Sequence, residues 1–281
     1  MARQLDLLVD GLGFGESPRW HEGRLWYSDF SHQRVSSVVP GQRPRIEQEL
    51  DDRPSGLGWL PDGRLLIVSM HRRVILRLEA DGTLALHADL SLIASADVND
   101  MVVAADGTAY VGNFGSDVLA GEPLQPAQLA LVRPDGSVSI AAQGLAFPNG
   151  SVITPDGAWL IVGETLAARY TAFPIGGDGA LGMGRVWAEL KGRAPDGCTL
   201  DAEGAIWFAD AAGGGVARVR EGGEILDVIA TPDTAYACML GGEAGRTLFI
   251  LTSPSPPTAK LVPGSGKIWS VEVDVPRAGR P

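Results

Sequence analysis

A glycine-centred turn recurs six times along the chain, and this repeat restricts the fold more than any other feature. Neighbouring turns lie 40 to 50 residues apart and contain Gly23, Gly63, Gly107, Gly157, Gly204 and Gly245. Each turn joins two short apolar runs, as in "LPDGRLLIVS" and "DAEGAIWFAD", which is the sequence form of a β-hairpin. A third apolar run follows each hairpin, and a weaker fourth run follows most of them.

Four short strands in each unit of this length are typical of a propeller blade. The sequence therefore predicts an all-β fold, a six-bladed β-propeller with four antiparallel strands per blade, and a β-sandwich with coincidental turns is the alternative. Because the repeat covers nearly the whole chain, we expect residues 1–281 to form one domain. The N-terminal "QLDLLVDG" has no hairpin of its own, so we expect it to add an outer strand to the last blade and close the ring.

Composition excludes several classes of function. The net charge is −11 and no tract is rich in lysine or arginine, which argues against nucleic acid as a partner. No stretch is apolar and long enough to span a bilayer, and the start of the sequence lacks the pattern of a secretory signal. Cys198 and Cys238 fit no disulfide framework or metal spacing, so we expect both to be buried in a reduced compartment. These features predict a cytoplasmic protein, a monomer or small homo-oligomer, whose partner is a small molecule.

The repeat also places one set of side chains around the central axis. In a propeller the first strand of each blade lies nearest the axis, so equivalent positions at its start form a ring at one mouth of the channel. Counting back from each turn glycine gives Glu16, Ser55, Asn99, Asn149, Asp196 and Ala237.

Two carboxylates in this ring, Glu16 and Asp196, repel each other unless something offsets their charge. A divalent cation is the simplest offset, and oxygen ligands suit hard ions such as calcium, magnesium and manganese. A channel with polar, water-filled ends is one alternative, and carboxylates that cap backbone amides are another. The four histidines show no spacing that is typical of a zinc site.

Several motifs resemble one known family. They are "GESPRW", "NDMVVAADG", "FPNGSVITPDG", "APDGCTLDAEGAIWFAD" and "ACMLGGEAGRTLFILT". Together they are similar to the SMP-30/gluconolactonase/LRE-like proteins over almost all of the chain. The resemblance implies a six-bladed propeller that hydrolyses sugar lactones with one divalent metal in its channel. It implies Glu16, Asn149 and Asp196 as metal ligands and Asn99 as a residue near metal and substrate. Calcium is the expected ion, with zinc, manganese, magnesium and iron as alternatives.

Two positions depart from the family pattern. Some sugar-lactonase members carry an arginine two residues before the position of Asn99, where this chain has Asp97. Some also carry a substrate-contacting glutamate in a later loop, where Asp117 is the nearest acid. These changes alter which lactone fits and leave the metal ligands untouched.

The loops that follow the second strand of each blade should open on the same face as the ring. Two of them are long, residues 113–128 and 252–266, and long loops on a rigid scaffold commonly carry specificity. His71 and Phe114 lie on this face, and Met70, Phe114 and Leu119 leave room for a more apolar pocket. Glu164 and Asp210 either orient the ligands or bond to backbone. The predicted substrate-binding residues are Asn99, Asp117, Asp97, His71 and Phe114.

Opening a lactone, which is a cyclic ester, needs a polarised carbonyl and an activated water, and a divalent metal supplies both. Asp196 is the candidate general base, unless it is only a ligand, and Asn99 is suited to hold the carbonyl or a ring hydroxyl. No G-x-S-x-G motif is present, which argues against a serine hydrolase. Two alternatives stay open: a metal-dependent esterase or organophosphate hydrolase on the same scaffold, and a ligand-binding propeller without catalysis.

Overall fold

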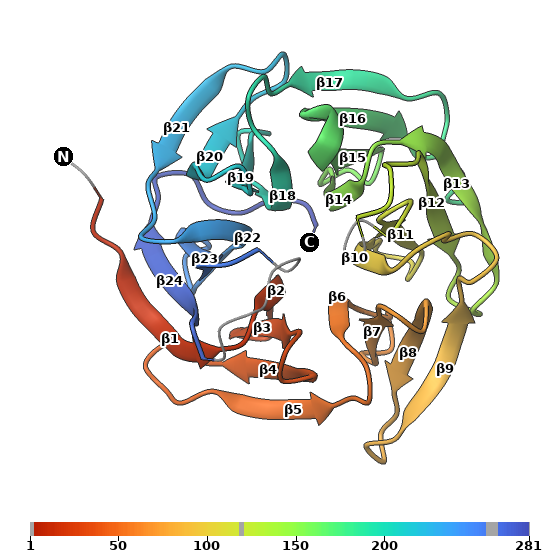
Figure 1. Cartoon of the computed structure of the whole chain (residues 1–281), viewed down its shortest axis with the longest axis horizontal. Helices are drawn as coiled ribbons and strands as arrows, with labels where there is room; N and C mark the ends of the chain where they lie inside the picture. The colour runs from red at the N-terminus through yellow and green to blue at the C-terminus, as the bar shows by residue number, and fades with distance from the viewer. Residues whose placement is uncertain (1–2, 118–120, 257–263, 281) are drawn as a thin grey trace.

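The chain folds into a ring of six four-stranded antiparallel sheets, as the computed structural model shows (Figure 1). The structure describes residues 3–117, 121–256 and 264–280. In five of the sheets four consecutive strands run in order from the axis to the rim, and each sheet is one blade. The prediction of an all-β, six-bladed propeller is therefore confirmed.

The first three blades contain twelve strands in chain order. Blade 1 consists of β2 (Gly15–His21), β3 (Arg24–Asp29), β4 (Arg34–Val38) and β5 (Arg45–Glu49). Blade 2 consists of β6 (Pro54–Trp59), β7 (Leu65–Ser69), β8 (Val74–Leu78) and β9 (Leu84–Asp89). Blade 3 consists of β10 (Val98–Val103), β11 (Ala109–Asn113), β12 (Ala127–Val132) and β13 (Val138–Leu145).

The remaining blades complete the ring. Blade 4 consists of β14 (Pro148–Ile153), β15 (Trp159–Glu164), β16 (Arg169–Pro174) and β17 (Arg185–Glu189), with the short 3-10 helix η2 (Thr165–Ala167) after β15. Blade 5 consists of β18 (Pro195–Leu200), β19 (Ile206–Asp210), β20 (Gly215–Val219) and β21 (Ile225–Ile229). Blade 6 consists of β22 (Thr234–Gly241), β23 (Thr247–Ser253), β24 (Gly266–Glu272) and β1 (Asp6–Leu12).

The six repeated glycines lie in the turns between the first and second strands of the blades. All six have positive φ angles, between 68° and 90°. A side chain at such a position would strain the backbone, whereas glycine adopts this conformation without cost. The turn chemistry that marks the repeat in the sequence is therefore the chemistry that the hairpins need.

Strand β1 closes the ring, as the sequence predicts. It pairs antiparallel with β24 and so forms the outer edge of the sheet that contains the last three strands. The N-terminal and C-terminal parts of the chain thus share one blade, which ties the two ends of the ring together (Figure 1).

Apolar side chains fill the spaces between neighbouring blades. A separate buried cluster lies at each of the six blade–blade interfaces. Trp207 and Tyr170 are among the largest fully buried side chains, and both belong to these clusters. The two cysteines, Cys198 and Cys238, are buried here as free thiols, as predicted. Burial of apolar surface between blades therefore holds the ring together.

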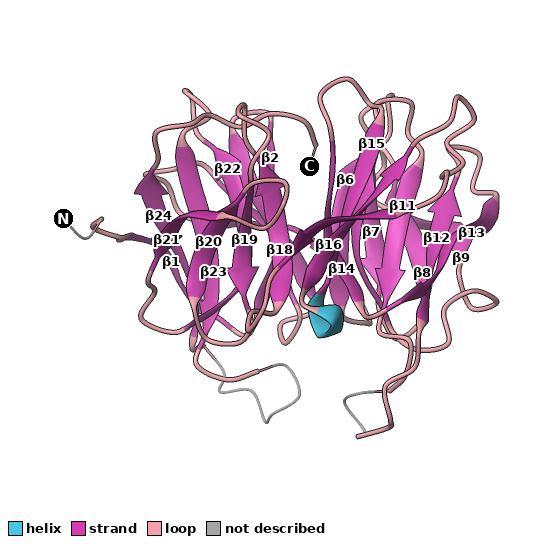
Figure 2. Cartoon of the chain, turned by 90° about the horizontal axis from the view of Figure 1, so that it is seen from above, coloured by secondary structure: helices cyan, strands magenta, loops and turns pink. Residues whose placement is uncertain are grey.

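The two ends of the channel differ. Helix η2 and the starts of the inner strands lie at one end, which we call the ring face, and the C terminus lies at the other (Figure 2). There the segment 276–280 crosses three blades through backbone hydrogen bonds to Gly245, Leu200 and Ile153. No helix in the described residues is long and apolar enough to cross a membrane.

Candidate active site at the ring face

A cavity of about 290 Å³ opens where the inner strands begin, and we call it the mouth cavity. Polar and apolar side chains from five blades line it. They are Glu16, Phe30, Asn99, Phe114, Leu124, Phe147, Asn149, Thr165, Leu166, Asp196, Ala211, Tyr236 and Pro256. All four residues predicted to hold metal or to catalyse are among them, and so is Phe114. The structure therefore brings together residues that are up to 180 positions apart in the sequence.

Glu16 and Asp196 are both buried, each 8% exposed. The pKa of Glu16 lies well above its usual value, mainly because the carboxyl group is buried and secondly because of the charge of Asp196. Burial, followed by the charge of Asp100, raises the pKa of Asp196 to about 8. Among the described residues no cationic side chain forms an ion pair with either carboxylate. Two buried acids thus face one cavity without an ion-pair partner among the described residues.

Side-chain hydrogen bonds link the neutral members of the ring. Ser55 Oγ donates to Asn99 Oδ1 at 3.3 Å, and Asn99 Nδ2 donates to Asn149 Oδ1 at 3.1 Å. Asn149 Nδ2 in turn donates to Thr165 Oγ1 at 3.2 Å. These contacts orient the two amides, and the nearby Asn149 amide lowers the pKa of Asp196, opposing part of the effect of burial.

Gly150 allows blades 4 and 5 to approach each other at the ring. A Cβ atom built on Gly150 would lie 2.3 Å from the backbone oxygen of Asp196. No side chain fits there, because real Cβ atoms do not come so close to backbone. The glycine of "PNG" therefore sets the spacing between Asn149 and Asp196.

Buried acids at the ends of the second strands fix the segments that lead into the ring. Asp29 accepts a hydrogen bond from Phe14 N at 3.2 Å, two residues before Glu16. Glu164 accepts one from Ala146 N at 2.9 Å, three residues before Asn149. Asp210 accepts one from Ala194 N at 2.9 Å, two residues before Asp196. The sequence left open whether Glu164 and Asp210 orient the ligands or bond to backbone. The structure shows that both bond to backbone. Each of these bonds holds the segment that leads to a ring residue.

Aromatic and aliphatic side chains form the outer wall of the mouth cavity. Phe114 and Phe147 lie against each other with ring centroids 4.6 Å apart. Phe14 packs on Phe30 and Tyr236 behind the wall, at 5.4 and 4.8 Å. The wall is therefore a hydrophobic surface next to two buried acids.

The repeat in the sequence also marks part of this wall, and the prediction of the site did not use that signal. Four wall residues directly follow the second strands of their blades: Phe30, Phe114, Thr165 and Ala211. The repeat places these positions on the ring face, yet only Phe114 was named among them. Leu124, Phe147, Leu166 and Pro256 come from loops, and no repeat marks their positions.

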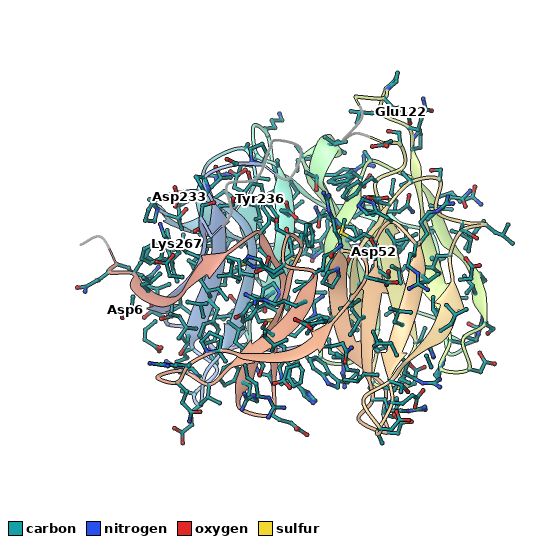
Figure 3. The ribbon with its side chains drawn as sticks, turned by 60° about the horizontal axis from the view of Figure 1, so that its bottom comes forward. Asp6, Asp52, Glu122, Asp233, Tyr236 and Lys267 are labelled. Carbon is teal, nitrogen blue, oxygen red and sulfur yellow. The ribbon has the colours of Figure 1, made fainter. Side chains whose placement is uncertain are left out.

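Blade 6 departs from the ring that the repeat predicts. Ala237 packs in the apolar cluster between blades 6 and 1, and the preceding residue, Tyr236, lines the mouth cavity. The first and second strands of every blade contain a register shift near this end, and in blade 6 it lies between Ala235 and Ala237. Tyr236 lies toward the face from which the loop carrying Glu122 projects (Figure 3). Burial, followed by the charge of Asp196, raises the pKa of its hydroxyl.

Three predicted substrate-binding residues do not line the mouth cavity. Asp97 and His71 pair with each other instead, with 2.6 Å between Asp97 Oδ2 and His71 Nδ1. The backbone N–H of Asp117 donates to Glu122 in the loop after β11. A role for these three in substrate binding stays a prediction. Both long loops reach the cavity through Leu124 and Pro256, whereas Leu119 and residues 257–263 lie outside the described residues.

The donor set fits a hard divalent cation. It consists of two carboxylates and two amides, all oxygen donors, and it contains no histidine or cysteine. The described residues contain no cluster of three or more histidine, cysteine or acidic side chains, because half of this set is asparagine. The two unpaired acids are the feature that a divalent cation would neutralise.

Comparison with known proteins identifies similar chains. A family model described as the SMP-30/gluconolactonase/LRE-like region matches residues 14–254. A 6-deoxy-6-sulfogluconolactonase from Pseudomonas putida is 27% identical over 279 residues, which cover 95% of this chain and 94% of that one. The pentonolactonase XacC from Haloferax volcanii is 26% identical over 253 residues, covering 85% of this chain and 81% of its own.

A solved structure shows the same fold. The chain matches a calcium-binding protein, regucalcin, from Agrobacterium tumefaciens with a TM-score of 0.84. The match covers 100% of this chain and 97% of that one, at 21% identity. At this level of identity the likeness concerns the six-bladed fold.

Proposed function

The chain belongs to the SMP-30/gluconolactonase/LRE-like family, and we propose that it is a metal-dependent lactonase whose active site is the mouth cavity. The observation that carries this proposal is the pair of buried carboxylates, Glu16 and Asp196, which form no ion pair within the described residues. Both curated relatives are named as lactonases, which supports the reaction class.

Glu16, Asn149 and Asp196 would hold the cation, with Asn99 beside it. All four donors are oxygen atoms, which suits a hard divalent cation, and calcium is the expected ion from the family resemblance. When bound, a divalent cation polarises an ester carbonyl and lowers the pKa of a water molecule. The buried setting of the two carboxylates strengthens their attraction for such an ion.

Asp196 is the residue that we assign as general base. It takes a proton from the attacking water, the water oxygen bonds to the carbonyl carbon, and the bond between that carbon and the ring oxygen breaks. The proton then passes to the ring oxygen, so that the product is a hydroxy acid. Asn99, which the Ser55 and Asn149 side chains hold in place, is suited to hydrogen-bond the substrate carbonyl or ring substituent.

The wall of the mouth cavity favours one class of lactone. Phe30, Phe114, Phe147 and Leu124 present hydrocarbon to the substrate, and the described wall offers few hydrogen-bonding groups beyond the ring, chiefly Thr165 and Tyr236. A polyhydroxylated sugar lactone would leave most of its hydroxyls without partners here, which is unfavourable. We therefore propose a small lactone that carries an alkyl or aryl substituent.

The same wall also favours a second candidate function. An apolar cavity beside a divalent cation suits aryl esters and organophosphate triesters, and such a hydrolase would use the same ring residues. The two candidates differ in whether a cyclic ester or an open one is preferred.

A substrate panel with the metal-loaded protein tests the proposal. It contains glucono-δ-lactone, an alkyl-substituted δ-lactone, an aryl acetate and an aryl organophosphate, each measured with calcium, manganese, magnesium and zinc. We expect the alkyl lactone to give the highest kcat/KM and the Glu16→Gln/Asp196→Asn double variant to be inactive. Preference for the aryl acetate or the organophosphate would select the second candidate, and preference for glucono-δ-lactone would overturn the apolar substrate class alone. No turnover of any substrate with any metal would overturn the proposed function.

A further inference from the structure

The opposite end of the channel contains a second cavity, of about 390 Å³, which we call the distal pocket. The segment 276–280 crosses the ends of blades 4, 5 and 6, and the pocket occupies the uncovered half, at the ends of β2, β6 and β10. Its volume lies within the range of small-molecule sites. None of its lining residues belongs to the mouth cavity.

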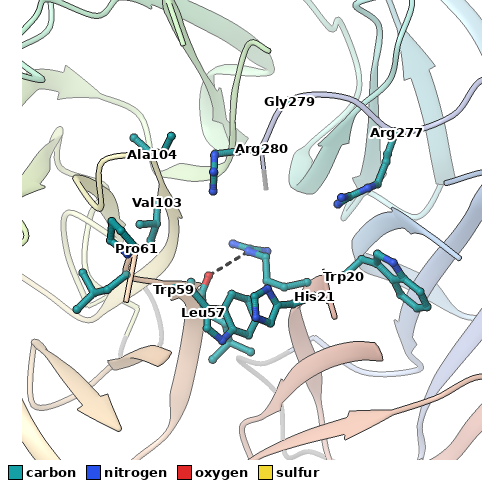
Figure 4. Close-up of a pocket in the computed structure, with 14 residues that line it drawn as sticks. Trp20, His21, Leu57, Trp59, Pro61, Val103, Ala104, Arg277, Gly279 and Arg280 are labelled. Carbon is teal, nitrogen blue, oxygen red and sulfur yellow. Dashed lines mark hydrogen bonds between the residues drawn. The ribbon is translucent and has the colours of Figure 1, made fainter. Parts of the chain in front are cut away.

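Two arginines on the crossing segment border the distal pocket. Arg277 and Arg280 extend from it toward the space above His21 and Trp59 (Figure 4). In the described residues neither guanidinium has a side-chain hydrogen bond or an ion pair, and no aspartate or glutamate lines the pocket. Arg218, by contrast, pairs with Asp201 in the same region of blade 5.

A third arginine forms the floor and is already neutralised. Arg19 is 5% exposed and donates to Asp100 Oδ1 at 2.6 Å and to the backbone oxygens of Met101 and Leu57. The charge that remains in the pocket is therefore that of Arg277 and Arg280. These two guanidinium groups attract anions to the pocket, although acids lie nearby: Glu22 is 3.8 Å from His21, and Arg280 also borders a neighbouring cavity lined by Asp106 and Asp156.

The remaining wall is largely apolar and rigid. His21 stacks on Trp59 with ring centroids 3.9 Å apart and planes 13° apart. Burial lowers the pKa of His21, the nearby Glu22 carboxylate partly opposes this, and Arg277 adds a smaller lowering effect. Leu60 and Val103 complete a hydrocarbon surface beside the two guanidinium groups.

We propose that the distal pocket binds a small organic anion, whose carboxylate or phosphate group pairs with Arg277 and Arg280 and whose body packs on the apolar wall. A planar guanidinium binds carboxylate or phosphate through two parallel hydrogen bonds, which lysine does not. Carboxylate and phosphate ligands share this oxyanion chemistry. The site is independent of the proposed lactonase activity, because it uses none of the same residues.

Direct binding measurements on the full chain test the proposal. The probes are benzoate, which is a carboxylate with an apolar body, phenyl phosphate, and the neutral benzamide, titrated at low ionic strength by calorimetry. We expect saturable binding of at least one anion with a Kd of about 1 mM or tighter, and none of benzamide. Tighter binding of benzoate would indicate a carboxylate ligand, and tighter binding of phenyl phosphate a phosphate ligand.

Matched variants assign the binding to the distal pocket. Arg277→Gln/Arg280→Gln should weaken anion binding at least about tenfold, as expected for the loss of charge-assisted hydrogen bonds. Arg43→Gln removes an exposed arginine from the loop between β4 and β5 and should leave binding unchanged. Because Arg277 and Arg280 are exposed, we expect the variant to fold, and its melting temperature checks this. Equal anion binding by the double variant, or no saturable binding of either anion up to about 10 mM, would overturn the proposal.

Discussion

Asp210 Oδ1 accepts a hydrogen bond from the backbone N–H of Ala194 at 2.9 Å and so fixes the chain two residues before Asp196. Asp210 also pairs with Arg193 at 2.9 Å. The carboxylate is buried, and it lies outside the mouth cavity. Its effect on the ring therefore passes through the backbone that leads into β18.

Replacement of Asp210 with alanine should weaken metal binding about 10- to 100-fold, which is the usual effect of losing a group that orients a ligand. The reason is that the segment before Asp196 loses its hydrogen bonds. Calorimetric titration of the metal-free variant with calcium and manganese measures this affinity.

Blade 5 offers a matched control for this variant. Asp201 is also buried, pairs with Arg218 at 2.6 Å and accepts backbone hydrogen bonds from Glu203 and Ala205, but at the other end of the blade. Asp201→Ala should lower the melting temperature in the same way and leave metal affinity near the wild-type value. Similar metal affinities of the two variants would remove the positioning role of Asp210.

Asp196→Asn should separate coordination from proton transfer. An amide oxygen still coordinates a cation, but the amide accepts no proton from water at neutral pH. With Asp196 as general base, we expect kcat to fall about 10²- to 10⁴-fold at saturating metal. Lactone hydrolysis measured across a metal titration checks this, with metal affinity determined separately. Near-wild-type turnover by the metal-saturated variant would leave Asp196 as a ligand only.

The metal-free protein should lose stability as pH rises. Glu16 and Asp196 have pKa values above their usual ones in the folded state, the latter at about 8, whereas Asp titrates near 3.9 when unfolded. Between these values the folded state holds more protons than the unfolded state, so the free energy of unfolding falls with rising pH. We expect the melting temperature of the chelator-treated protein to decrease between pH 5 and pH 8.

Two comparisons assign this pH dependence to the ring. Glu16→Gln/Asp196→Asn removes both titrating groups and should flatten the profile relative to the wild type. Saturating calcium should restore stability most strongly at the higher pH, where more of the carboxylate groups are ionised. A wild-type profile that is no steeper than that of the double variant would contradict the prediction.

Phe147→Ala should raise the KM for an alkyl-substituted lactone about tenfold, which corresponds to the loss of roughly 1.5 kcal/mol of apolar contact. The KM for glucono-δ-lactone should change little, because that substrate gains less from a hydrocarbon wall. Leu86→Ala, a change at a side chain that is 60% exposed on β9, serves as the control. Equal shifts in KM for both lactones would indicate that Phe147 shapes the cavity without selecting the substrate.

The repeat predicted the fold well because the hairpin glycines carry a local requirement. Gly63 and Gly107 have φ angles of 87° and 90°, and this need for a positive φ is written in the sequence wherever a "DG" turn occurs. Counting back from the same glycines was sufficient to place Glu16, Asn149 and Asp196 at one cavity. Local turn chemistry and the symmetry of the ring together determine these positions.

The wall of the cavity was harder to predict because it depends on loops and on the position of a register shift in blade 6. Phe147 and Leu124 reach the cavity from connections whose paths no repeat specifies. All six blades contain a register shift near the ring, but in blade 6 it lies between Ala235 and Ala237, and Tyr236 lines the cavity there. A count along the sequence does not detect where such a shift lies. The Asp97–His71 pair likewise depends on two different blades.

Because β1 pairs with β24, the last blade cannot be completed until β24 has been synthesised. Residues 6–12 leave the ribosome before the six hairpins, yet their partner in the last blade is made roughly 250 residues later. At about 5–20 residues per second, this strand waits for some tens of seconds before it can pair. The first five blades have been synthesised by then, so the ring closes only after they have been made. Until that moment the nascent chain exposes unpaired strand edges on which chaperones can act.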